Sequence, residues 1–174
     1  MSNKAAKILL TQYRECLDNP NQNFHVGLVN ENDPFTWNVT FFGPQGSPYE
    51  GGIFTATMAF STDYPNVPPT LRFMTPKLFH PNVYEDGFVC ISILHSSGED
   101  IASGESSDIR WSPAQNPYSV LNSVLSLLHE EDFNLNSPAN IEAAKLFKDH
   151  RDEFRKRAKQ LVEESLEIFY GDEY

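Results

Sequence analysis

The 174-residue sequence has little positive charge and no long apolar run. Its formal charge of −11 argues against nucleic acid or an anionic membrane as the main partner. No apolar run approaches the ~20 residues of a membrane-spanning helix. Charged residues interrupt the apolar ones near the N-terminus, so a signal-peptide pattern is lacking. We therefore expect neither a direct membrane span nor a nucleic-acid partner.

Cysteine is also scarce. Cys16 and Cys90 lie far apart in the sequence and form neither a metal-ligand cluster nor a disulfide framework. We expect no metal, no cofactor and a reducing compartment, the cytosol or the nucleus. Because Cys16 falls on the apolar positions of a helical pattern, we interpret it as structural, and Cys90 becomes the cysteine of interest.

Hydrophobic periodicity predicts one α+β domain over residues 1–168, with a short acidic tail at 169–174. An amphipathic N-terminal helix ends near residues 18–20. Four strand-like segments follow, at about 24–29, 37–41, 53–60 and 71–74, and predict an antiparallel meander. Helices are then expected from Asn116 and Pro117, after Ser137 and Pro138, and over 151–168.

The segment 80–95, HPNVYEDGFVCISILH, carries the most chemistry. Gly87 can supply a turn that returns Cys90 to Asn82, eight positions earlier. A thiolate is a nucleophile, and an amide N–H aimed at the attacked carbonyl stabilises the tetrahedral oxyanion. The segment therefore predicts acyl transfer through a thioester.

A polar stretch over 96–109 begins six positions after Cys90 and shows neither strand nor helix periodicity. It is rich in carboxylates, namely Glu99, Asp100, Glu105 and Asp108. One interpretation is a solvated acidic loop. Its proximity to Cys90 in the sequence favours a role in catalysis or in placing an acceptor.

These motifs resemble the ubiquitin-conjugating enzyme family. The segment His80-Pro81-Asn82, Gly87 and VCISIL at 89–94 is similar to that family's active-site segment. FGPQGSPYEGG at 42–52, YPNVPP at 64–69 and WSP at 111–113 resemble further family motifs in the same order. The resemblance spans about residues 4–165. It implies the ubiquitin-conjugating fold, and the acidic insertion with His95 before it and Arg110-Trp111 after it resembles a minority subclass.

The resemblance implies a role for each site residue. Cys90 receives ubiquitin as a thioester, Asn82 stabilises the oxyanion, and His80 gives structural support. Tyr84 and Ser137 line the lysine groove and gate it. Each residue also has a simpler interpretation.

The simpler interpretations are as follows. Cys90 is a buried thiol, Asn82 braces the turn, and Tyr84 is an ordinary aromatic side chain. Ser137 is a helix N-cap worth about 1 kcal/mol. His80, ten positions before Cys90, invites a Cys–His dyad interpretation.

Partners are also implied by the resemblance. A ubiquitin-activating enzyme, which consumes the ATP, and a RING-type ligase bind one face, to which the resemblance assigns Lys4, Lys7, Asn66, Val67, Pro113 and Ala114. The first 18 residues carry a net charge of +1 against −12 for the remainder, so their helix is either a docking element or an ordinary solvated face. Asn66 stands where the family commonly has a large apolar anchor. The stretch HEEDFNLNSP at 129–138 lacks the usual Glu-Pro-Asn and is about two residues longer.

Resemblance to this subclass implies that the enzyme builds ubiquitin chains that mark proteins for the proteasome. It also implies a role either in degradation at the endoplasmic reticulum or with cell-cycle ligases. We expect a monomer in the cytoplasm or nucleus, or recruited by partners to the endoplasmic reticulum surface. Three alternatives stay open: conjugation of a SUMO-like modifier, a non-enzymatic binding variant of the same fold, and an unrelated cysteine hydrolase using Cys90 and His80.

Overall fold

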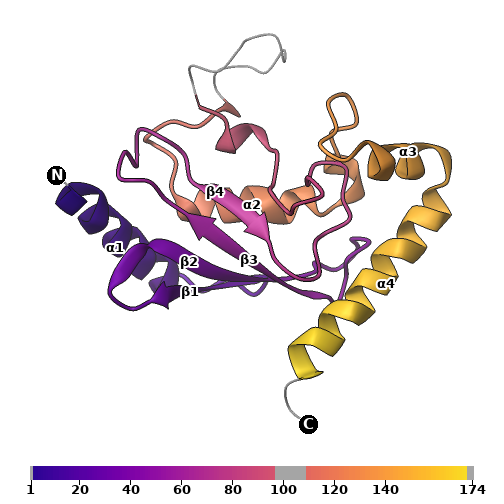
Figure 1. Cartoon of the computed structure of the whole chain (residues 1–174), viewed down its shortest axis with the longest axis horizontal. Helices are drawn as coiled ribbons and strands as arrows, with labels where there is room; N and C mark the ends of the chain where they lie inside the picture. Colours follow the sequence, from indigo (N-terminus) through magenta and orange to yellow (C-terminus); the bar gives the residue numbers. More distant parts are fainter. Residues whose placement is uncertain (1, 97–108, 172–174) are drawn as a thin grey trace.

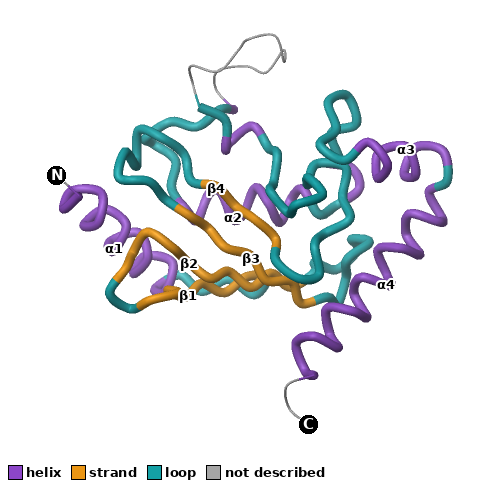
Figure 2. The backbone as a smooth tube through the Cα atoms, viewed as in Figure 1, coloured by secondary structure: helices purple, strands orange, loops and turns teal. Residues whose placement is uncertain are grey.

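The computed structural model describes residues 2–96 and 109–171. Helix α1 spans Ser2–Asp18 and leads into four strands, β1 (Phe24–Asn30), β2 (Asp33–Phe42), β3 (Ile53–Ala59) and β4 (Thr70–Phe73). Each strand pairs antiparallel with the next in the order β1-β2-β3-β4, which is the predicted meander. The predicted α+β fold, with an N-terminal helix, the meander and C-terminal helices, is confirmed (Figures 1 and 2).

Three helices follow the sheet: α2 (Pro117–Leu127), α3 (Ile141–Asp149) and α4 (Arg151–Tyr170). Two short 3₁₀ turns are described: η1 (Ser92–Leu94) lies at the end of the active-site segment, before α2, and η4 (Glu130–Asp132) lies between α2 and α3. Helix α4 ends two residues beyond the expected boundary, so Phe169 and Tyr170, assigned from the sequence to the tail, are helical. Among the described helices, none is both long and apolar enough to cross a bilayer.

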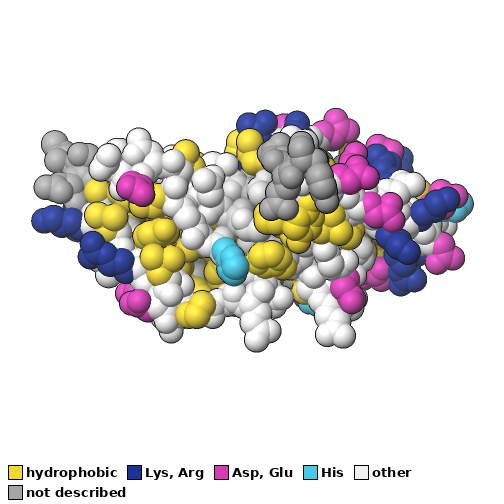
Figure 3. Space-filling view, turned by 90° about the horizontal axis from the view of Figure 1, so that it is seen from below, with side chains coloured by type: hydrophobic (Ala, Val, Ile, Leu, Met, Phe, Trp, Pro, Cys, Tyr) yellow, Lys and Arg dark blue, Asp and Glu magenta, His cyan; other side chains and the backbone are white. Residues whose placement is uncertain are grey.

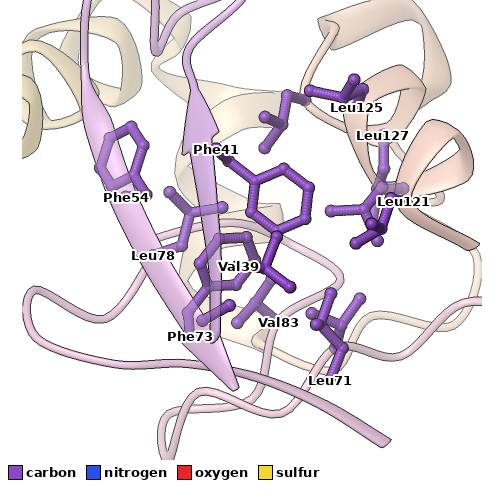
Figure 4. Close-up of a cluster of buried hydrophobic side chains, with 14 of the residues drawn as sticks. Val39, Phe41, Phe54, Leu71, Phe73, Leu78, Val83, Leu121, Leu125 and Leu127 are labelled. Carbon is purple, nitrogen blue, oxygen red and sulfur yellow. The ribbon is translucent and has the colours of Figure 1, made fainter. Parts of the chain in front are cut away.

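The core lies between the sheet and α2. Strand alternation buries one face of β2 and β3, as at Val39, Phe41 and Phe54. Figure 4 shows Phe41 and Val39 pointing toward Leu121 on α2. Burial of each such side chain contributes roughly 1.5–3 kcal/mol. Helix α1 packs against the β1–β2 side of the sheet and α4 against β3, so the two helices flank the sheet at opposite ends (Figure 1).

The start of α2 matches its prediction. Asn116 caps the helix by accepting a hydrogen bond from the Ser119 N–H at 2.9 Å, and Ser119 Oγ accepts one from the Asn116 N–H at 3.0 Å. Pro117 occupies the first helical turn, where its missing N–H has no intrahelical partner to lose.

The start of α3 does not match. Its N-cap is Asn140, whose side-chain oxygen accepts from the Ala143 N–H at 3.0 Å. The interpretation of Ser137 as the cap of this helix is wrong, because the chain runs on for three further residues before the helix begins. Backbone N–H groups of Ala139 and Asn140 donate to the Pro81 carbonyl at 2.8 and 3.0 Å, which ties this segment to the HPN motif.

Candidate active site

The chain turns sharply between Asn82 and Cys90, as expected from Gly87. Gly87 has a φ of +100°, and a β-carbon there would lie 2.2 Å from the Phe73 carbonyl oxygen. Only glycine fits this position without strain. The turn pairs Val83 with Val89 in an antiparallel bridge, and the Cys90 N–H donates to the Asn82 carbonyl at 2.8 Å. The expected nucleophile, Cys90, and the expected oxyanion donor, Asn82, are therefore joined by a backbone hydrogen bond.

The Asn82 side chain does not make a local turn bond. It is 2% exposed, and its Nδ2 donates to the Asn134 carbonyl at 2.8 Å while its Oδ1 accepts from the Asn134 N–H at 3.0 Å. Asn82 thus braces a segment 52 residues away, and the simpler interpretation, in which its side chain braces its own turn, is wrong. Sequence reasoning missed Asn134 because only tertiary folding brings it to Asn82.

Phe133 anchors the segment that carries Asn134. Its ring centroid lies 4.4 Å from that of His80 and 4.9 Å from that of Phe147. Arg155 on α4 adds a two-pronged ion pair with Glu130, at 2.7 and 2.8 Å. This hydrogen-bonding partner lowers the pKa of the Glu130 carboxyl. The segment from η4 to Asn134 is therefore held from both the core and α4.

His80 is fully buried and its ring contacts backbone groups. Nδ1 accepts from the Asn82 N–H at 2.9 Å, so Nε2 carries the proton and donates to the Leu127 carbonyl at 2.7 Å. Burial lowers the pKa of His80 to about 4, despite the bond to Leu127. Because both ring nitrogens are engaged, the alternative of a Cys–His dyad using His80 is wrong.

Tyr84 follows Asn82 closely and lies beside the thiol. Its side chain is exposed, and a hydrogen bond with Cys90 is the main cause that raises the pKa of its phenol. Tyr84 and Cys90 both border a hollow of about 310 Å³. Tyr84 therefore offers a phenolic O–H donor close to the sulfur of Cys90.

Cys90 is half-buried and free. Cys90 also borders a second hollow of about 550 Å³, which Asn82 and Ser137 line. The structure therefore brings Cys90, Asn82 and Ser137 around one groove, and Tyr84 lines the other hollow that Cys90 borders. Cys16, in contrast, is 5% exposed on α1, and burial raises the pKa of its thiol to about 11.

One polar residue near the thiol was not assigned a role from the sequence. His95 Nε2 lies 3.7 Å from Cys90 Sγ, within the range of a hydrogen bond that involves sulfur. His95 served only as a marker of the subclass in the sequence. Its closeness to Cys90, five positions earlier, was the available signal.

The residues assigned to partner binding lie apart from the thiol on connected elements. Tyr64 Oη donates to Gln12 Oε1 on α1 at 2.6 Å, and Trp111 Nε1 donates to the Pro65 carbonyl at 2.8 Å. These bonds join α1, the 64–69 loop and the 111–114 segment. All six assigned side chains are exposed: Lys4, Lys7, Asn66, Val67, Pro113 and Ala114. Glu99, Asp100, Glu105 and Asp108 lie outside the described residues.

Comparison with known proteins identifies the class. The family model described as ubiquitin-conjugating enzyme matches residues 8–162. Ubiquitin-conjugating enzyme E2 7 of Arabidopsis thaliana is 45% identical over 97% of this chain and 100% of its own length. Ubiquitin-conjugating enzyme E2 G2 of Homo sapiens is 44% identical over 95% of this chain and 99% of its own. The solved structure of human ubiquitin-conjugating enzyme E2 G1 has a TM-score of 0.63 and 39% identity, and covers 71% of this chain and 93% of that chain.

The chain belongs to the ubiquitin-conjugating enzyme family and is a ubiquitin-conjugating transferase. Near-full-length similarity to relatives named as such enzymes disfavours both the unrelated hydrolase and the non-enzymatic variant. The acidic insertion seen in the sequence is consistent with the subclass of the E2 G2 relatives.

Proposed function

We propose that Cys90 accepts ubiquitin as a thioester and passes it to a lysine amine together with a RING-type ligase. The observation that carries this proposal is the arrangement around one thiol. Cys90 borders two hollows, with the Asn82 amide and Ser137 along one and the Tyr84 phenol along the other. A carbonyl on Sγ would have a buried amide nearby and two approaches for a nucleophile.

The transfer step needs an unprotonated amine, because free lysine has a pKa of about 10.4. Tyr84 and Ser137 are the residues that we assign to orienting and desolvating the amine, which lowers its pKa. The amine attacks the thioester carbonyl, the oxyanion is stabilised by Asn82, and the C–S bond then breaks to release the Cys90 thiolate. His80 supports the site by holding the Asn82 backbone N–H and the end of α2. No cofactor is required in this chain, since the activating enzyme consumes the ATP.

The binding face for the ligase and the activating enzyme is assigned to the connected elements of α1, the 64–69 loop and the 111–114 segment. Val67 is 39% exposed and supplies apolar surface, whereas the adjacent Asn66 is polar. Figure 3 shows Lys and Arg side chains at the end of the molecule that holds the N-terminus. Basic side chains on α1 of an otherwise acidic protein favour docking on acidic partner surfaces.

We assign the product to ubiquitin chains that signal proteasomal degradation, and the enzyme to the cytoplasm or nucleus, or to the endoplasmic reticulum surface through partners. Both cysteines are free thiols, which suits a reducing compartment. The acidic insertion after Cys90 is assigned to placing the acceptor ubiquitin. We expect the enzyme to act as a monomer.

A discharge experiment tests the ligase and chain assignments. The ubiquitin-loaded protein is mixed with purified RING domains and with ubiquitin variants that each keep a single lysine. We expect RING-stimulated chains with one preferred lysine. Val67→Asp should abolish the stimulation, whereas the matched control Val29→Asp, on an exposed position of β1, should not. Equal RING stimulation of wild type, Val67→Asp and Val29→Asp would contradict the assigned binding face. Chains that show no preference among the single-lysine ubiquitins would contradict the assigned product.

A further inference from the structure

The active-site sulfur has a basic neighbour. His95 Nε2 lies 3.7 Å from Cys90 Sγ, and Tyr84 borders a hollow that both of these residues also line. An imidazole nitrogen at this distance can accept a proton from a thiol, and a phenol in the same hollow can donate to the resulting thiolate.

The position of His95 is fixed by the backbone on both sides. Its N–H donates to the Ser92 carbonyl at 2.9 Å and closes η1, while its carbonyl accepts from the Trp111 N–H at 3.0 Å. Trp111 is 2% exposed and is bonded through Nε1 to the Pro65 carbonyl. The backbone of His95 is therefore held next to Cys90 by η1 and by the buried Trp111.

The accessibility of His95 also suits proton transfer. His95 is half-buried and lines both hollows that flank Cys90, so water can reach the site. His80, in contrast, is fully buried, and both of its ring nitrogens are bound to backbone groups. Of these two histidines on either side of Cys90 in the sequence, only His95 meets the sulfur.

We propose that His95 is the proton acceptor for the Cys90 thiol when ubiquitin is loaded. The S–H bond of Cys90 breaks and an Nε2–H bond forms on His95, which gives a thiolate and an imidazolium. The thiolate attacks the thioester carbonyl on the activating enzyme, the new C–S bond forms, and the old C–S bond breaks to release that enzyme's thiolate. The imidazolium then returns its proton to solvent. This inference rests on the proposed function of Cys90 as the nucleophile.

The magnitude of such assistance is measurable. A free cysteine has a pKa of about 8.5, so only a few per cent is thiolate at neutral pH. General-base catalysis typically contributes about 10²–10⁴-fold in rate. His95→Gln removes the base but keeps an amide near the position of Nε2. His25→Gln is the matched control, because His25 is exposed on β1 and packs on Phe42 away from the thiol.

The first test does not use ubiquitin. Alkylation of Cys90 by iodoacetamide at neutral pH is followed by mass spectrometry, with Cys16 in the same chain as an internal control of folding. We expect Cys90 alkylation to fall about 100-fold in His95→Gln, at the low end of general-base effects, and to stay unchanged in His25→Gln. Cys16 should stay unreactive in both. Cys90 reactivity within twofold of wild type would overturn the proposal.

The second test measures loading. Transfer of ubiquitin from the pre-loaded activating enzyme in a single turnover should slow about 100-fold in His95→Gln, while discharge of the loaded protein to free lysine should change less. Equal losses in both steps would overturn the assignment to loading. If wild type forms no reducible adduct at all, the proposed function fails, and alkylation still decides the role of His95.

A third measurement uses a protein with intact His95. The nitrogen-15 spectrum of the wild-type imidazole should show the proton on Nδ1, because Nε2 must accept from the thiol. Replacement of the thiol in Cys90→Ala should change that signal. A proton on Nε2 in the thiol form would mean that the ring donates to sulfur, and the proposal would be wrong.

Discussion

The Asn82 side chain and the Asn134 backbone exchange two hydrogen bonds, at 2.8 and 3.0 Å, across 52 residues of sequence. One N–H of the Asn82 amide is therefore used to hold the loop that follows η4. The amide has a second N–H. Bracing and oxyanion stabilisation are thus compatible within one side chain, and they can be separated by the choice of substitution.

Asn82→Ala should load ubiquitin at the wild-type rate but discharge it to lysine about 100-fold more slowly, since one oxyanion donor is lost. It should also lower the free energy of unfolding by about 1–2 kcal/mol, because two hydrogen bonds are lost. Single-turnover discharge and urea unfolding measure the two effects. Asn82→Asp keeps an acceptor for the Asn134 N–H but has no N–H donor, so wild-type discharge by this variant would refute the oxyanion role.

His80 predicts a pH dependence of stability. Its pKa is lowered to about 4 in the folded protein, against about 6.5 when unfolded, so the unfolded chain binds more protons between these values. The contribution of neutral His80 to the free energy of unfolding is therefore complete above pH 6.5. It falls by about 3 kcal/mol as the pH is lowered toward 4. Urea unfolding of wild type and His80→Gln at several pH values measures it. The variant should be less stable at pH 7 but lose less on acidification; parallel curves would contradict the account.

The start of α3 gives a matched pair of substitutions. Asn140→Ala should reduce the free energy of unfolding by about 1 kcal/mol, because the cap on the Ala143 N–H is lost. Ser137→Ala should leave stability nearly unchanged and instead slow lysine discharge, since Ser137 lines the groove with Cys90. Thermal unfolding and discharge are measured for both. A larger stability loss for Ser137→Ala than for Asn140→Ala would reverse the two roles.

Gly87→Ala should disrupt the turn that holds Asn82 against Cys90. The positive φ and the carbonyl 2.2 Å from the added β-carbon predict a loss of at least about 2 kcal/mol in stability, together with slower loading. Gly27→Ala is the control, because a β-carbon there meets no atom within 4 Å and the φ is ordinary. The control should be neutral or slightly stabilising. Equal stability of the two variants would contradict the strain argument.

Local patterns carried most of the fold prediction. Alternation at Trp37, Val39 and Phe41 gave β2, and Asn116 with Pro117 gave the start of α2, because these signals lie within a few residues. Ser137 was misassigned as a cap because Ser-Pro and Asn140 are both plausible starts, and hydrogen bonds to the Pro81 carbonyl delay the helix. Asn134 and the Leu127 partner of His80 were not predictable, since their bonds join segments about 50 residues apart.

The site could be predicted only in part. The turn at Gly87 is local, so the proximity of Cys90 and Asn82 followed from the sequence. The dyad alternative named His80 from its spacing to Cys90 alone, and spacing does not report burial. His80 lies in the core, whereas η1 returns His95 to the sulfur within five residues.

The most direct measurement is a charging assay. The protein is mixed with the activating enzyme, ATP and ubiquitin, and the products are separated on a gel with and without thiol. The account predicts a band heavier by one ubiquitin that disappears with thiol and is not formed by Cys90→Ala, while Cys16→Ala still forms it. A thiol-sensitive band that persists in Cys90→Ala, or no band with wild type, would contradict the central claim that Cys90 carries ubiquitin.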